Sequence, residues 1–426
     1  MKRLTLVILI VLVSFGAYAA GQQAEDAKPA DAAKPAPTIQ IWFSNYDGMS
    51  QYAPTFAERF NAASKDIKVE VTVIPGTAVD FENKLNAAKL SGQTPDGAYI
   101  VLSSLAPWGV RGEFLVLDDY ISSWNERGDF LESALSVGKV GGKYMALGVA
   151  PAPINFVYRK DMFVKAGLDP SKPPRNWKEL REYAEKLTMK DAKGNIVQAG
   201  MDMPTTDFFL NISEPLMLMN GAEVVDEVNG KPMLTDPAVI ETLEYMYGYA
   251  RDNLSLPNDW QKKETMAFMN GNSAMAFLMV DNVKALVKNR PELDGQILYG
   301  PPLSNKKTSA FCGYRLLTIM KSSKNADATW EVMKAFMSVE ETRKRMEIGI
   351  VPIRKSLGTE FVTLNPAVNK VVVDTAAVGK GAFAVPWVNI LYKYWAPAFE
   401  SVMQGKVKPA EAMKSAQEQI LAELPK

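Results

Sequence analysis

The strongest constraint on the fold of this chain is a regular alternation of apolar strands and amphipathic helices near its beginning. Residues 39–43, 67–74 and 99–102 have the apolar patterns of buried strands. Residues 51–63 have the pattern of an amphipathic helix, and Asp80 is the predicted N-cap of a second helix. This order predicts parallel strands with helices on both faces of the sheet. In such sheets, ligands bind at the carboxyl ends of the strands.

A second unit of strands and helices is predicted after Tyr144. Residues 156–159 have a strand pattern, and Asn176 and Asp236 are good N-caps for the helices that follow them. Pro409 begins the last predicted helix, at a position where its missing N–H costs nothing. Helices are also predicted over 326–337, 389–403 and 409–424.

The first residues have the pattern of a bacterial signal peptide. A basic pair precedes an apolar run over 4–15, and the small residues Ala17 and Ala19 follow it. The run is shorter than the about 20 residues of a membrane-spanning helix, so cleavage after about Ala19 is favoured over a retained helix. Residues 1–19 are therefore predicted to be a signal peptide and 20–37 a flexible linker. The mature chain is expected to be periplasmic or extracellular.

Composition excludes several kinds of site. The sequence has one cysteine, Cys312, and no histidine, so an internal disulfide, a histidine-dependent nucleophile and a histidine metal site are ruled out. No cofactor and no metal are expected. The 48 basic and 48 acidic residues balance, and 46 against 48 remain once Lys2 and Arg3 leave with the signal peptide, a net charge of −2. Nucleic acid is therefore not a predicted partner.

One block of short motifs carries a family resemblance. Its members are GKY at 142–144, VAP at 149–151, VYRKDMF at 157–163, AGL at 166–168 and PPRNWKEL at 173–180. Weaker supporting motifs are PD at 95–96, AFMNG at 267–271 and Gly313 before LLTI at 316–319. Together they make the chain, from about Thr38 to its end, resemble the extracellular solute-binding proteins of the group that includes maltose-binding protein. Trp177 in the last motif of the block is expected to pack beneath a helix rather than to touch ligand.

The resemblance implies an α/β, two-lobed periplasmic binding protein fold (type II), in which each lobe is a mixed sheet flanked by helices, with a hinge between them. It places 38–150 and 310–350 in the first lobe, and 151–309 and 351–426 in the second. Such proteins are receptor components of ABC transporters. The chain would bind a small solute, here a mono- or oligosaccharide, in the cleft between the lobes. It would deliver this ligand to permease subunits in the inner membrane. A monomer is expected.

A sugar presents an apolar C–H face and a ring of hydroxyls, so its site needs flat aromatic rings and planar polar groups. Ser44, Asn45 and Tyr46 directly follow the first predicted strand, where the sheet rule places ligands. They suit equally well a polar loop that caps the next helix. Ser103 and Trp108 follow the third strand, and Trp108 is either a stacking platform or a core residue.

The second unit contributes further candidates. Asn155 is the only hydrogen-bonding side chain at the hinge crossing that the resemblance implies, and Asp207 lies at the start of a helix. Trp260 lies in a polar loop. Asp281 and Asn282 fall where relatives often have a stacking aromatic, which favours polar contacts with ligand hydroxyls or an amine. Asp281 equally suits a helix cap.

Two late segments complete the candidate ligand-binding set. Gly313, Tyr314 and Arg315 lie where relatives place ligand-contacting backbone at a strand end, and glycine permits close approach there. Trp387 and Tyr392 lie where the family often has a stacking aromatic. Core packing is the alternative for both rings.

Two other functions remain open. A secreted carbohydrate-active enzyme needs paired carboxylates, but the acidic pairs at 118–119 and 340–341 lie beside predicted helix starts and suit caps. We therefore predict no enzymatic activity and no catalytic residue. A receptor for a non-sugar solute, such as a polyol or a glycerol phosphate, could use Arg315 or Arg354 to bind an anion.

Overall fold

The computed structural model describes residues 36–45, 49–227, 229–381, 383 and 385–424. The predicted signal peptide, the predicted linker up to residue 35, and Tyr46 lie outside these residues. Within the described ranges, no helix is long and apolar enough to cross a membrane.

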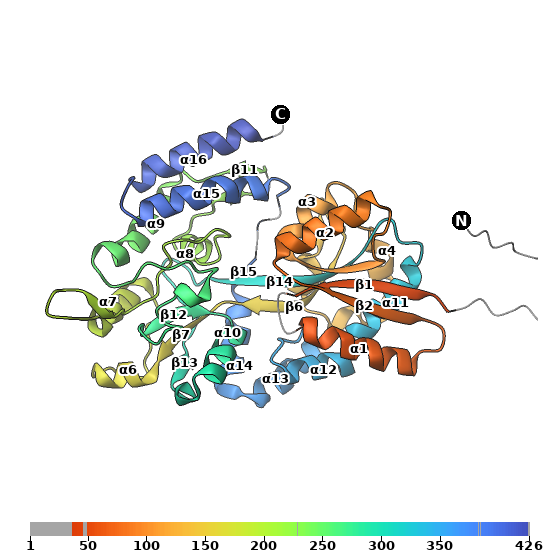
Figure 1. The fold of residues 1–426 in the computed structure, drawn as a ribbon, viewed down its shortest axis with the longest axis horizontal. Helices are drawn as coiled ribbons and strands as arrows, with labels where there is room; N and C mark the ends of the chain where they lie inside the picture. The colour runs from red at the N-terminus through yellow and green to blue at the C-terminus, as the bar shows by residue number, and fades with distance from the viewer. Residues whose placement is uncertain (1–35, 46–48, 228, 382, 384, 425–426) are drawn as a thin grey trace, which may run out of the picture. The chain divides into compact units, whose positions relative to one another are not determined.

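The first sheet begins with the three predicted strands. β1 (Thr38–Ser44) lies between β2 (Lys68–Ile74) and β3 (Gly97–Val101) and is parallel to both. As predicted, helices α1 (Met49–Ala63) and α2 (Ala78–Leu90) connect them (Figure 1). Every residue of β3 is buried, as expected for a strand that is covered on both faces.

A strand from much later in the chain makes this sheet mixed. β14 (Ala310–Ile319) runs antiparallel to β3 and also pairs antiparallel with β6 (Leu147–Pro153). β15 (Gly379–Lys380) pairs in parallel with the first residues of β14. All ten residues of β14 are buried, so this strand is a central element of the fold.

The start of α2 differs from the prediction. Thr77, not Asp80, is the N-cap: its hydroxyl accepts a hydrogen bond from the Asp80 amide at 3.3 Å. The Asp80 carboxylate accepts one from the Thr77 amide at 2.7 Å. Together these bonds form a capping box, which satisfies two otherwise unpaired amides. Asp80 was misassigned because an acidic residue suits the third helical position as well as the cap.

The second sheet is antiparallel, whereas a mixed sheet was expected. β7 (Asn155–Arg159) lies between β12 (Met275–Leu278) and β13 (Ile297–Tyr299) and is antiparallel to both. A long stretch of chain separates β7 from β12, so no single crossover helix imposes parallel pairing here.

The helices around the second sheet begin where their caps predict. The Asn176 side chain accepts from the Glu179 amide at 2.9 Å at the start of α7 (Trp177–Leu187). Asp236 accepts from the Ala238 amide at 2.7 Å at the start of α9 (Pro237–Arg251). Both predicted N-caps are confirmed.

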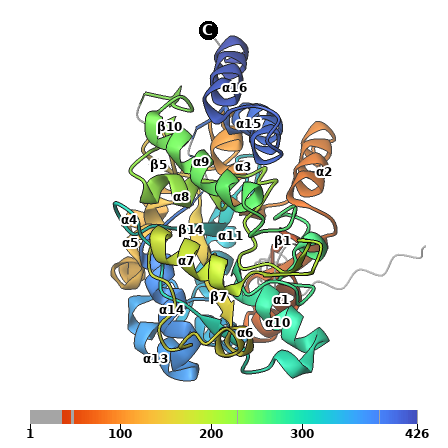
Figure 2. The same cartoon turned by 90° about the vertical axis from the view of Figure 1, so that its left-hand side faces the viewer.

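Three of these helices pack together. α9 contacts both α15 (Val388–Met403) and α16 (Pro409–Glu423), which Figures 1 and 2 show side by side. Pro409 lies in the first turn of α16, as predicted. Trp177 of α7 is buried and stacks on Tyr245 with ring centroids 4.1 Å apart, which confirms its packing role.

Two large hydrophobic cores form around the two sheets. We call the core around the first sheet the first core and the core around the second sheet the second core. β14 contributes to both, because Phe311 belongs to the second core and Cys312 to the first. The consecutive strands β6 and β7 also connect the two cores, and they lie beside β14. Between them, the Ile154 amide donates to the Phe311 carbonyl at 3.0 Å. Ile353 packs in the first core.

A third, small core lies between α12 (Val339–Glu347), α13 (Gly358–Leu364) and α14 (Pro366–Ala377). Further described helices are α3 (Leu102–Gly109), α4 (Asp118–Ser122), α5 (Glu132–Ser136), α6 (Lys160–Lys165), α8 (Ser213–Met219), α10 (Val280–Asn289), α11 (Ala326–Phe336) and the 3-10 helix η2 (Lys263–Thr265). Further strands are β4 (Lys139–Val140), β5 (Lys143–Tyr144), β8 (Met189–Lys190), β9 (Ile196–Gln198), β10 (Val225–Asp226) and β11 (Lys231–Pro232).

Candidate ligand-binding site

Two adjoining cavities, of about 250 and 270 Å³, lie where β6 and β14 run together. Ala152 of β6, Arg315 of β14, Gln261 and Met279 line both cavities. The two cavities are therefore compartments of one cleft. Its size lies in the range of small-molecule sites, about 300–1,000 Å³.

One wall of the cleft is built at the carboxyl ends of β2 and β3. We name this surface the sheet wall. It consists of Thr77 and Val79 at the start of α2, and Leu102 and Ser103 at the start of α3. This is the edge of the sheet at which the alternating pattern predicts ligand binding.

The other wall carries larger side chains, and we name it the Trp260 wall. Its members come from the second core and the loops around it, and they are Phe209, Asn211, Trp260, Gln261, Lys263, Met279, Asp281, Asn282 and Tyr392. Because these residues come from four separate segments of the chain, the wall depends on tertiary packing.

Trp260 is held in place from two sides. Its ring nitrogen donates to the Phe277 carbonyl at 3.0 Å, and only 4% of its surface is exposed. The Lys263 ammonium lies 3.0 Å from the centroid of the ring and also donates to the Trp260 carbonyl. This is a cation–π contact, and it covers one face of the indole.

Two tyrosines give the 270 Å³ cavity an aromatic lining. The Tyr392 ring stands at 89° to that of Phe209, with centroids 5.2 Å apart. The Tyr314 hydroxyl hydrogen-bonds with the Ser133 hydroxyl at 2.8 Å. Burial raises the pKa of both tyrosine hydroxyls well above the usual value, so both rings are neutral hydrogen-bonding surfaces at physiological pH.

Gln261 offers the cleft an unused hydrogen-bond donor. Its side-chain oxygen accepts from the Phe208 amide at 3.4 Å. Its side-chain nitrogen is buried and has no hydrogen-bond partner among the described residues. A buried donor without a partner is costly, and a ligand oxygen in the cleft would satisfy it.

Lys263 of the Trp260 wall and Asp202, which does not line the two cavities, both have perturbed pKa values. Burial lowers the pKa of Lys263 to about 7, although Asp207, Asp259 and Asp202 attract its charge. Burial raises the pKa of Asp202 to about 7, although its carboxylate accepts hydrogen bonds from the Phe268 and Ala267 amides. Perturbed pKa values of this kind are typical of functional sites.

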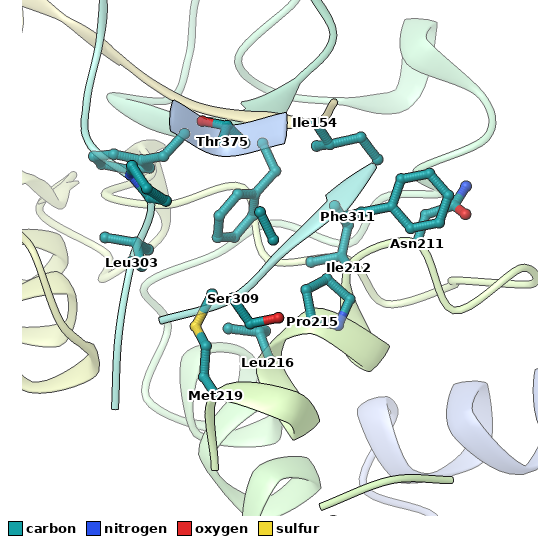
Figure 3. A pocket seen from close by; sticks show the side chains of 14 residues that line it. Ile154, Asn211, Ile212, Pro215, Leu216, Met219, Leu303, Ser309, Phe311 and Thr375 are labelled. Carbon is teal, nitrogen blue, oxygen red and sulfur yellow. The ribbon is translucent and has the colours of Figure 1, made fainter. Parts of the chain in front are cut away.

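A third cavity, of about 20 Å³, adjoins the cleft and is shown in Figure 3. Asn211 and Phe311 line both this cavity and the 270 Å³ one. Most of its other lining residues are apolar, among them Ile154, Ile212, Leu216 and Leu303. It has room for about one water molecule and is too small for a sugar.

The structure brings eight of the sequence-predicted contact residues together in the cleft. They are Ser103, Trp260, Asp281, Asn282, Gly313, Tyr314, Arg315 and Tyr392. Tyr46 lies outside the described residues. The six that do not line these cavities are Ser44, Asn45, Trp108, Asn155, Asp207 and Trp387.

Two of the six are core aromatics. Trp108 is 1% exposed in the first core and stacks on Phe114. Trp387 is 8% exposed and packs in the second core. Neither ring lines the two cavities, whereas Trp260 and Tyr392, which are buried as well, do line them.

Asp207 is a structural residue rather than a contact. Its carboxylate is fully buried and accepts hydrogen bonds from the Asn211, Ile212 and Ser213 amides at 2.8–3.0 Å, and from the Ser213 hydroxyl at 2.7 Å. These bonds satisfy amides at the start of α8, which have no partner within the helix.

The other three residues belong to strand ends. Asn155 is fully buried in β7, where its side-chain amide donates to the Pro153 carbonyl at 3.2 Å. Ser44 is 2% exposed at the end of β1. Asn45 is exposed, and its backbone amide donates to the Ile74 carbonyl, which extends the pairing of β1 with β2.

Several residues that line the cleft are absent from the predicted contact set, and they include Thr77, Phe209, Gln261, Lys263 and Met279. Gln261 and Lys263 follow Trp260 in a polar loop, and that proximity was the only local signal. Tertiary packing alone turns this loop toward the cleft.

A fold of two cores joined by crossing strands, with a cleft beside those strands, defines a binding protein of the two-lobed α/β class. A family model described as a bacterial extracellular solute-binding protein matches residues 55–370, and the chain belongs to this family. The family name implies a location outside the cytoplasm, periplasmic or extracellular.

Solved structures and named relatives agree with this class. The chain is similar to the crystal structure of an ABC transporter solute-binding protein from Thermotoga lettingae bound with α-D-tagatose. The TM-score is 0.75 and the identity 19%, over 90% of this chain and 99% of that one. It is 22% identical to the maltotriose-binding protein of Pyrococcus abyssi, over 74% of this chain and 66% of that one.

A third relative binds a different kind of solute by its name. The sn-glycerol-3-phosphate-binding periplasmic protein UgpB of Escherichia coli (strain K12) is 27% identical, but over only 37% of this chain and 36% of that one. Together with the observed sheets and cores, the structural match establishes the α/β, two-lobed periplasmic binding protein fold.

Proposed function

We propose that this chain is the receptor of an ABC importer, which binds a mono- or oligosaccharide in the cleft and delivers it to permease subunits in the inner membrane. The observation that carries the proposal is the cleft at the carboxyl ends of β2 and β3, where aromatic rings and hydrogen-bonding side chains meet. Trp260 and Tyr392 offer apolar surface to a sugar ring, and Ser103, Gln261 and Asn282 offer partners for its hydroxyls.

The same proposal covers how the ligand is held. Two lobes close about the crossing strands β6, β7 and β14 when the ligand binds. One lobe consists of 38–150 and 310–350, and the other of 151–309 and 351–426. The packing of Ile353 in the first core favours a boundary a few residues after 350. Hinge closure is the known behaviour of periplasmic binding proteins in general. We further propose that residues 1–19 are removed on export and that the mature chain is a monomer without enzymatic activity.

The test is a thermal-shift screen of the mature chain against mono-, di- and oligosaccharides, polyols and their phosphates. A ligand at 100 times its Kd stabilises the folded chain by about 2.7 kcal/mol, which raises the melting temperature by several degrees. We expect one class of saccharide to do this. The proposal fails if no small solute changes the melting temperature while a polymer or a protein partner does.

Prolonged incubation separates the receptor from a secreted enzyme. Each saccharide that binds is kept with the chain and then analysed by chromatography. We expect it to be recovered intact, because binding alone breaks no bond. Release of shorter products would replace the receptor proposal with the enzyme alternative.

A further inference from the structure

Lys263 is an ionisable group of the cleft that has no ion-pair partner among the described residues. Its side chain is only partly exposed and lines the 250 Å³ cavity. Among the described residues, no carboxylate oxygen lies within 4.0 Å of its ammonium nitrogen. Its close contacts are the Trp260 ring and the Trp260 carbonyl. Neither of these carries a full negative charge.

The acidic residues that attract Lys263 are engaged elsewhere. The Asp207 carboxylate accepts its hydrogen bonds from the start of α8, and that of Asp202 from the Phe268 and Ala267 amides. One Asp259 oxygen accepts from the Gln261 amide at 3.0 Å, and the other lies 3.4 Å from the Lys262 ammonium. The described carboxylates that attract Lys263 therefore make their close contacts with other groups.

The lining around Lys263 is rich in donors. Gln261 brings a buried amide nitrogen that has no partner among the described residues, and Arg315 brings a guanidinium to both cavities. Among the described lining residues, Lys263 and Arg315 have basic side chains and Asp281 has an acidic one. A lining of this kind complements a ligand that carries negative charge and several acceptor oxygens.

We propose that Lys263, with Arg315 and the Gln261 amide, forms a subsite for the anionic group of an acidic saccharide, either a carboxylate or a phosphate. This inference rests on the proposed function, since it names the class of sugar that the cleft selects. An anion at the subsite accepts charge-assisted hydrogen bonds from Lys263 and supplies a negatively charged partner, which the described residues do not provide within 4.0 Å.

The contact between Lys263 and Trp260 bears on neutral sugars as well. The ammonium covers one face of the indole ring, so on that face the cleft presents a cation rather than an apolar surface. A neutral sugar that stacks there has to displace Lys263 and gains no charge partner for it. An acidic sugar engages Lys263 directly, which makes this residue a determinant of specificity.

Calorimetric titration of matched ligand pairs tests the inference. D-Glucuronate is compared with D-glucose, D-galacturonate with D-galactose, and glucose 6-phosphate with glucose, which separates a carboxylate from a phosphate. sn-Glycerol 3-phosphate is compared with glycerol to separate the anion from the sugar. We expect at least one acidic sugar to bind about tenfold or more tightly than its neutral parent.

Two substitutions locate the effect. Lys263→Met keeps the methylene packing over Trp260 and removes the charge, so the ratio of its affinity for the acidic sugar to its affinity for the neutral parent should fall about tenfold or more. Lys263→Arg keeps the charge and should stay within about threefold of the unaltered chain. The melting temperatures of the ligand-free variants check that both fold.

The outcomes separate this inference from the proposed function. If neutral sugars bind as tightly as their acidic counterparts, or if Lys263→Met binds the acidic sugar like the unaltered chain, the anionic subsite is wrong and the sugar receptor stands. If glycerol 3-phosphate binds and no sugar does, the anionic subsite stands, but the proposal that the ligand is a saccharide is wrong. If no probe of either kind binds, the proposed function and the subsite both fail.

Discussion

The two walls of the cleft are built in different ways. The sheet wall consists of residues at the first turns of α2 and α3, and its position follows from the parallel strands β2 and β3. The Trp260 wall collects large or charged side chains from loops and helices of the second core. From this comparison we expect the sheet wall to supply shape and backbone geometry, and the Trp260 wall to supply most of the interaction energy and the selectivity.

The largest loss of ligand affinity is expected from a substitution in the Trp260 wall. Trp260→Ala should lower the affinity for the saccharide about 100-fold, because it removes the aromatic surface and the anchor of the Lys263 side chain, a loss of about 3 kcal/mol. Calorimetric titration measures it. Trp124→Phe, a buried ring of the first core, is the control and should leave the affinity unchanged. Equal losses in both variants would show that the effect is one of folding.

Buried carboxyl groups with raised pKa values, namely Asp202, Asp207 and Glu214, lie in the part of the chain that forms the second core. Glu214 in α8 is 2% exposed, and burial raises its pKa to about 8, although Lys380 lies 3.8 Å away. A carboxyl whose pKa is raised on folding contributes stability at low pH and loses it as the pH rises toward 8. Glu214→Gln should therefore be more stable than the unaltered chain at pH 9, by about 2 kcal/mol.

Denaturant unfolding at pH 5 and pH 9 measures this change in the free energy of unfolding. At pH 5 the two proteins should differ little, because Glu214 is already protonated when folded. Glu244→Gln, at an exposed position of α9, is the matched control. A Glu214→Gln variant that gains nothing between pH 5 and pH 9 would mean that this carboxyl is ionised and stabilised in the folded chain.

A smaller loss of ligand affinity is expected from a substitution of Gln261, which lines both cavities. Gln261→Leu keeps the side-chain volume and removes the donor that has no partner among the described residues. The affinity for the saccharide should fall about fivefold, since a hydrogen bond of about 1 kcal/mol is lost in a desolvated site. Gln404→Leu, at an exposed position at the end of α15, serves as the control for the titration. An unchanged affinity in Gln261→Leu would place the ligand away from this residue.

The sheet wall should show the smallest effect on binding. Thr77→Ala removes the capping box of α2 and should lower the free energy of unfolding by about 1 kcal/mol, with the affinity changed by less than threefold, roughly 0.6 kcal/mol. Thr77→Ser should restore the stability. If Thr77→Ala weakens binding as much as Gln261→Leu, the division of roles between the walls is wrong.

The same division explains what could be predicted from the sequence. The strands β1, β2 and β3 and the caps Asn176 and Asp236 have local signals, namely apolar periodicity and a capping side chain, and the structure has them where they were predicted. The cap of α2 was assigned to the wrong member of the Thr77–Asp80 pair because both residue types cap helices.

The Trp260 wall could be predicted only in part. Trp108, Trp387 and Trp260 all occur in plausible segments, but whether a ring faces a core or a cleft depends on residues far away in the sequence. Gln261 and Lys263 have no periodic pattern, and the packing of their loop against β12 brings them to the cleft. Long-range packing therefore decides the part of the site that carries the selectivity.

A crystal structure of the mature chain with the saccharide that raises its melting temperature most is the direct test of the central claim. We predict that the sugar lies in the cleft beside β6 and β14, in contact with Trp260, Gln261 and Arg315 on one side and with Ser103 on the other. A sugar bound away from these residues, or one cleaved into shorter products, would contradict the account.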